Sequence, residues 1–131
     1  MRSFGRDIVI VVCAISAGIH AALTPAHFGE GLGAGFGFLV ATIVLAGLAA
    51  ALTHSADRPV LAVAVVTLAG LLAAYVAAIT TGVPLLHPET EPVDGLALVT
   101  KAIEAVGLVA AARLLVPVRS LVRTRLERKL T

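Results

Sequence analysis

The chain has 131 residues, of which 59% are hydrophobic and 14% are charged, and its mean hydropathy is +1.02. A soluble domain usually carries about 25% charged residues, so this composition excludes an ordinary water-soluble domain and predicts one membrane domain. The pI near 9.2 does not indicate a nucleic-acid partner. The basic residues gather beside apolar segments, where cytoplasmic orientation and contact with anionic lipid explain them.

The first apolar run predicts a transmembrane helix over residues 7–24, ended by Pro25, because proline lacks an amide hydrogen and clashes with the preceding turn. Arg2 and Arg6 before an apolar stretch also fit the start of a secretory signal peptide. No small-x-small cleavage site follows the run, so we expect an uncleaved helix. Cys13 is the single cysteine, which excludes an intrachain disulfide, and we expect it to be a small packing residue.

Three further apolar runs follow the first one. They predict helices over residues 30–53, 59–81 and 94–116. Gly82 is a natural C-terminal stop and Asp94 a natural N-cap. Each run is long enough to span a hydrocarbon core of about 30 Å at about 1.5 Å per residue. The predicted fold class is all-α, a bundle of four transmembrane helices.

The basic residues are divided unequally between the two ends of these helices. All ten except Lys101 lie before the first helix, between the second and third, or at and beyond the end of the fourth. The other two connections hold acids and histidines. Because cytoplasmic loops carry an excess of Lys and Arg, we expect a multi-pass protein of the plasma membrane with both termini cytoplasmic. The segment 118–131 is expected to form a basic amphipathic tail on anionic lipid of the inner leaflet, with a solvated charged tail as the alternative.

Alternate positions are glycine at the start of the second predicted helix: Gly29, Gly31, Gly33, Gly35 and Gly37. A phosphate-binding loop is excluded, since no strand precedes the run and the G-x-G-x-x-G spacing is absent. Gly31 with Gly35, and Gly33 with Gly37, form GxxxG pairs, which allow close approach of membrane helices. The neighbouring helix belongs either to this chain or to another subunit. In the second case the subunit is part of a homo-oligomer or of a larger membrane complex.

Three ionisable residues lie within the predicted helices: His20, Lys101 and Glu104. A charge near the bilayer centre costs about 2.5–3.5 kcal/mol on insertion scales, so such residues normally face the bundle interior and have partners. Lys101 and Glu104 are three positions apart and share a helix face, which predicts a buried polar pair. A protonated Glu104, or one hydrogen-bonded to His20, is the alternative.

Histidines and carboxylates gather at the end without basic loops. The candidate ligands of a metal ion or a proton are His20, His27, Glu30, His87, Glu89 and Asp94, and Glu91 lies in the same loop. Zn²⁺ or Cu²⁺ accepts such ligands. Met1 is the one methionine, which argues against a thioether copper(I) site, and haem is not expected because only His20 clearly points inward. The alternative is structural, with His20 bonded to another helix and the loop histidines solvated, as is expected for His54.

Parts of the sequence carry a family likeness. Residues 18–28, 80–84 and 91–96, together with Glu104, resemble small four-helix integral membrane proteins common in actinobacteria. The resemblance covers most of the first helix, the second outer loop and the fourth helix. It implies the same architecture and no particular activity, and Lys101 has no counterpart in its pattern.

The sequence favours a small membrane protein with an outward-facing metal or proton site. A structural or accessory subunit of a larger membrane complex is the main alternative. A transporter component would need to oligomerise, and no broken helix or inverted repeat is evident. We do not expect an enzyme, because no nucleophile–base pair or known metal motif is present.

Overall fold

A computed structural model of the chain describes residues 2–84, 86 and 88–116. The four helices are α1 (Arg2–Glu30), α2 (Leu32–His54), α3 (Arg58–Thr80) and α4 (Gly95–Leu115). All four are long and apolar enough to cross a membrane. The predicted fold class is therefore confirmed, and the chain has the architecture of a multi-pass membrane protein. The predicted amphipathic tail, 118–131, lies outside the described residues.

Helix α1 does not end at Pro25, and that prediction is wrong. It continues through the proline to Glu30, 29 residues in all. A proline removes one backbone donor, and membrane helices tolerate this where side chains or neighbouring helices satisfy the freed groups. Beyond Pro25 the helix packs on α2, where the ring of His27 stacks on Phe38. The continuation keeps His27 on the same helix as His20, and a single residue, Gly31, connects α1 to α2.

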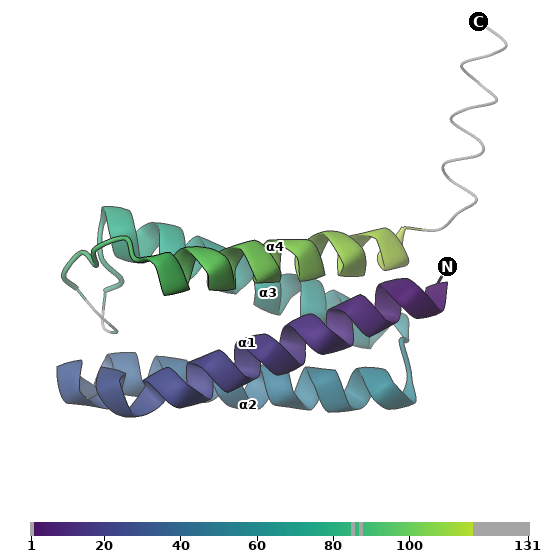
Figure 1. The fold of residues 1–131 in the computed structure, drawn as a ribbon, viewed down its shortest axis with the longest axis horizontal. Helices are drawn as coiled ribbons and strands as arrows, with labels where there is room; N and C mark the ends of the chain where they lie inside the picture. Colours follow the sequence, from purple (N-terminus) through teal and green to yellow (C-terminus); the bar gives the residue numbers. More distant parts are fainter. Residues whose placement is uncertain (1, 85, 87, 117–131) are drawn as a thin grey trace, which may run out of the picture.

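The helices are arranged as two antiparallel pairs, α1 with α2 and α3 with α4 (Figure 1). Helix α1 also packs along α4, whereas α2 and α3 contact each other much less than the other neighbouring helices do. The start of α1 and the end of α4 lie at one end of the bundle, and the α1–α2 turn and the α3–α4 loop lie at the other (Figure 1). We call the second end the loop end. It carries His27, Glu30, Glu91 and Asp94.

The core contains apolar side chains from all four helices. Its buried members are Val9, Val12, Cys13, Ala17, Leu45, Leu48, Leu52, Leu61, Ala64, Leu68 and Ala111. Many other large apolar side chains point outward, as expected where the hydrocarbon of a bilayer replaces water. Gly107 marks a close approach of α4 to α1, since a Cβ there would lie 2.5 Å from Cγ1 of Val12. A larger residue at this position would separate α4 from α1.

The glycine run of α2 has several structural roles. Gly31 joins α1 to α2 with an extended backbone. A Cβ on Gly35 would collide with the ring of Phe28 in α1, so this glycine allows close packing within the chain. A Cβ on Gly37 would meet only Leu86, at 3.9 Å. Gly33 is half-buried.

Candidate functional site

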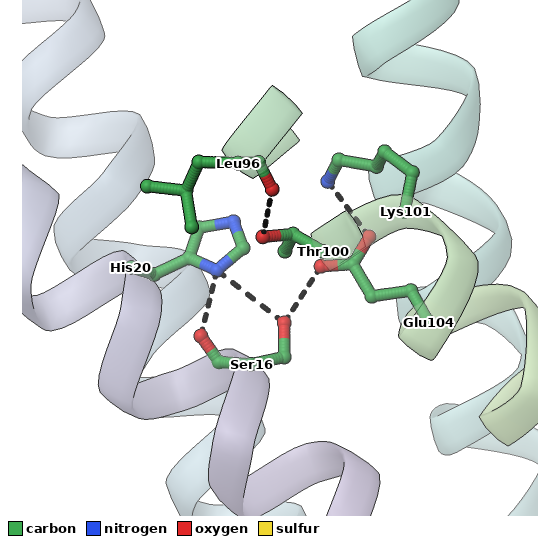
Figure 2. A network of polar contacts seen from close by, with 6 residues as sticks. All are labelled: Ser16, His20, Leu96, Thr100, Lys101 and Glu104. Atoms are coloured by element: carbon green, nitrogen blue, oxygen red, sulfur yellow. Dashed lines mark hydrogen bonds and ion pairs between the residues drawn. The ribbon is translucent and has the colours of Figure 1, made fainter. Parts of the chain in front are cut away.

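A buried polar network connects α1 to α4 (Figure 2). Glu104 of α4 is fully buried. Its Oε1 accepts a hydrogen bond of 2.6 Å from the Ser16 hydroxyl of α1, and its Oε2 accepts one of 2.7 Å from Nζ of Lys101. Both carboxylate oxygens are therefore bonded, as a buried charge requires. The pair of Lys101 and Glu104 has the geometry that its i,i+3 spacing predicts.

His20 joins this network through Ser16 and not by direct contact with Glu104. Its Nδ1 lies 2.8 Å from the carbonyl oxygen of Ser16 and 3.4 Å from the Ser16 hydroxyl. A carbonyl can only accept, so Nδ1 carries a hydrogen, and in the neutral ring Nε2 is then the acceptor. Sequence reasoning missed Ser16. Its position four residues before a helical histidine, on the same helix face, was the available signal.

Three residues at the loop end lie close enough together to hold a metal ion. One ligand atom from each of His27, Glu30 and Glu91 lies within 4.8 Å of the other two. Nδ1 of His27 donates to the carbonyl of Leu23 at 2.9 Å, which leaves Nε2 with a free lone pair for a metal. That Nε2 lies 3.9 Å from Oε2 of Glu30.

Packing against an aromatic ring orients both histidines of α1. The ring of Phe38 in α2 stacks on His27, with centroids 3.6 Å apart and planes inclined by 19°. The same ring lies 5.2 Å from His20. Because α1 is continuous, the two histidines, seven residues apart, share one face and meet one partner. Phe38 was not among the predicted site residues.

The third residue of the group comes from the α3–α4 loop. The amide of Glu91 donates to the carbonyl of Ala78, near the end of α3, at 2.9 Å. The turn before it depends on Gly82, which has φ +73°, and a Cβ there would collide with the carbonyl oxygen of Pro88. The fold of this loop therefore places Glu91 beside α1.

The structure brings together only part of the predicted ligand set. His20 is bonded to its own helix and lies outside the group of three. Asp94 is the N-cap of α4, where it accepts from the amide of Ala97 at 2.8 Å. Glu89 is exposed and does not belong to the group. His87 lies outside the described residues.

A cavity of about 520 Å³ adjoins both the network and the three-residue group. Its polar lining includes His20, His27, Tyr75, Glu91 and Lys101. The remaining wall is mainly apolar and comes largely from α2 and α3. A pocket of this size, apolar with a few polar groups, has the character of a small-molecule site.

Comparison of the chain with protein-family models, with characterised proteins and with solved structures finds no match to any of them.

Proposed function

We propose that the protein is a small multi-pass membrane protein that binds a divalent transition-metal ion at its loop end, through His27, Glu30 and Glu91. The observation that carries the proposal is the convergence of their three ligand atoms within 4.8 Å. They come from the end of α1 and from a loop whose Glu91 lies 61 residues beyond Glu30, so tertiary structure is needed to bring them together.

The chemistry of the three donors suits a divalent ion. One imidazole nitrogen and two carboxylates match Zn²⁺ and related first-row ions, with solvent completing the coordination. Two carboxylates also balance the charge of a divalent ion. The hydrogen bond from His27 to Leu23 orients the ring in the way that second-shell partners orient metal-binding histidines.

The proposed site faces away from the cytoplasm. Arg6, Arg58 and Arg113 are at the end of the bundle where α1 begins and α4 ends, and the acidic group is at the loop end. Cytoplasmic ends of membrane helices carry the excess of basic residues. We therefore assign both termini to the cytoplasm and the metal group to the outer surface of the plasma membrane.

Zinc titration of purified protein in mild detergent tests the proposal. We expect one Zn²⁺ per chain and at least tenfold weaker binding after His27→Ala or Glu91→Gln, because each change removes one of three protein ligands. His54→Ala is the matched control, since His54 lies at the other end of the bundle. Failure of the wild type to bind, or equal losses in the His54 control, would refute the assignment.

A further inference from the structure

The two antiparallel helix pairs are packed together mainly in one half of the bundle. The buried members of the core cluster fall within 9–17 of α1, 45–52 of α2 and 61–68 of α3, with Ala111 of α4. These segments lie toward the end where α1 begins and α4 ends, or at the middle of the bundle. Toward the loop end, the cavity of about 520 Å³ is lined by all four helices, and α2 and α3 contact each other little. Apolar packing therefore holds the two pairs together less firmly at the loop end.

The three residues of the metal group are fixed to different helix pairs. His27 belongs to the α1–α2 pair, where its ring stacks on Phe38 with centroids 3.6 Å apart, and Glu30 ends the same helix. Glu91 belongs to the α3–α4 pair, because its amide donates to the carbonyl of Ala78 at 2.9 Å. A metal ion bound by all three residues therefore connects one helix pair to the other.

The charges of the group make this connection depend on the ion. A carboxylate oxygen of Glu30 and one of Glu91 lie within 4.8 Å of each other. Two negative charges at this distance repel each other, whereas a divalent cation between them attracts both. Ion binding therefore favours the approach of the loop to α1, and loss of the ion favours their separation.

The contacts that hold α1 to α4 lie well away from the metal group. The Ser16 hydroxyl donates to Glu104 at 2.6 Å near the middle of both helices, and Gly107 lies against Val12 closer to the start of α1. His27 is 11 residues beyond Ser16, or roughly 16 Å along the helix at about 1.5 Å per residue. A small tilt of one pair about these contacts therefore separates the ligands at the loop end.

We propose that the metal ion is a clasp between the two helix pairs. It holds the loop end in the closed arrangement of Figure 1, and its removal lets the pairs separate there while the packed half stays together. This inference rests on the proposed metal function and adds what the ion does to the protein. An ion that binds only the closed arrangement shifts the equilibrium toward it about 100-fold at a free concentration about 100 times the dissociation constant.

Pulsed electron paramagnetic resonance on spin-labelled protein in detergent tests the clasp. The labels are placed in a Cys13→Ala background, on exposed positions of α2 and α4. Leu32→Cys with Leu98→Cys reports the loop end, and Ala50→Cys with Val109→Cys is the matched pair in the packed half. With EDTA we expect a broad distance distribution for the loop-end pair, and with Zn²⁺ a single narrow one at shorter distance. The matched pair is expected to give the same distribution in both conditions.

Two variants of the α3–α4 loop separate the clasp from metal binding alone. Glu91→Gln keeps His27 and Glu30, which lie on one helix, and removes the ligand from the other pair. At saturating Zn²⁺ its loop-end distribution should therefore stay broad. Glu89→Gln changes a carboxylate of the same loop that is outside the group, and it should narrow as the wild type does. Equal behaviour of the two variants would overturn the clasp.

Zinc titration of the same labelled samples distinguishes failure of the clasp from failure of the metal site. Binding of Zn²⁺ with an unchanged loop-end distribution would overturn the clasp and leave the metal function standing. Absence of Zn²⁺ binding would overturn both. Equal narrowing at the loop end and in the packed half would indicate general compaction of the bundle and would also overturn the clasp.

Discussion

Removing the charge partner of the buried Glu104 should destabilise the bundle strongly. Lys101→Met keeps much of the apolar length of the side chain but removes the Nζ that lies 2.7 Å from Oε2 of Glu104. Glu104 is fully buried, and its other oxygen is already bonded to Ser16. Loss of one member of a buried ion pair typically costs about 3–5 kcal/mol. We expect Lys101→Met to lower the free energy of unfolding by about 3 kcal/mol, near the lower limit of that range, because the hydrogen bond from Ser16 to Glu104 remains.

The compensating double variant distinguishes pairing from simple loss of packing. Glu104→Gln retains an acceptor for Ser16 but leaves the Lys101 ammonium without its charge partner, and because the Lys101 side chain is 16% exposed it should cost about 2–3 kcal/mol alone. Lys101→Met with Glu104→Gln removes both charges together and should lie within about 1 kcal/mol of wild type, since neutral replacement of a buried pair is often tolerated. The two single losses should therefore be far from additive.

The single cysteine gives a direct assay of unfolding. Cys13 is fully buried in the core, and a fluorogenic maleimide should label it only when the bundle opens. The free energies of unfolding come from its labelling across an SDS titration in mixed micelles. If the double variant lost the sum of the two single losses, within about 0.5 kcal/mol, the argument for a coupled buried pair would be refuted.

Two glycine substitutions test the packing and the loop. Gly107→Ala places a Cβ 2.5 Å from Val12 of α1 and should lower the free energy of unfolding by about 1–3 kcal/mol in the same assay. The control is Gly47→Ala, whose Cβ meets nothing within 4 Å and which should be neutral or slightly stabilising. Equal effects of the two substitutions would contradict the contact between Gly107 and Val12. Gly82 has φ +73° and lies against the loop backbone, so Gly82→Ala should displace Glu91. We expect zinc binding at least tenfold weaker in a titration. Unchanged zinc affinity would show that this turn does not position Glu91.

Hydropathy and local spacing were sufficient to predict much of this structure. The four apolar runs predict the four helices, because a span of the bilayer requires a minimum length and few charges. The contact of Lys101 with Glu104 follows from their i,i+3 spacing, which brings side chains together on any helix. The capping role of Asp94 is equally local, since an N-cap bonds to amides within the next turn.

The features that the sequence did not predict depend on tertiary contacts. Pro25 interrupts one backbone hydrogen bond but does not end α1, and the residues after it pack on α2, with His27 on Phe38 and Phe28 against Gly35. The selection of Glu91, and not Glu89, as the neighbour of His27 depends on the path of the loop. That path is set by the backbone of Gly82 and by the bond from Glu91 to Ala78. No local pattern contains this information.

X-ray absorption at the zinc edge, on protein loaded with one equivalent of Zn²⁺, tests the central claim most directly. The account predicts a first shell of nitrogen and oxygen at about 2.0–2.2 Å with the scattering of one imidazole. That imidazole signal should disappear in His27→Ala and persist in His54→Ala. Sulfur at about 2.3 Å, two or more imidazoles, or an unchanged spectrum in His27→Ala would contradict a site built from His27, Glu30 and Glu91.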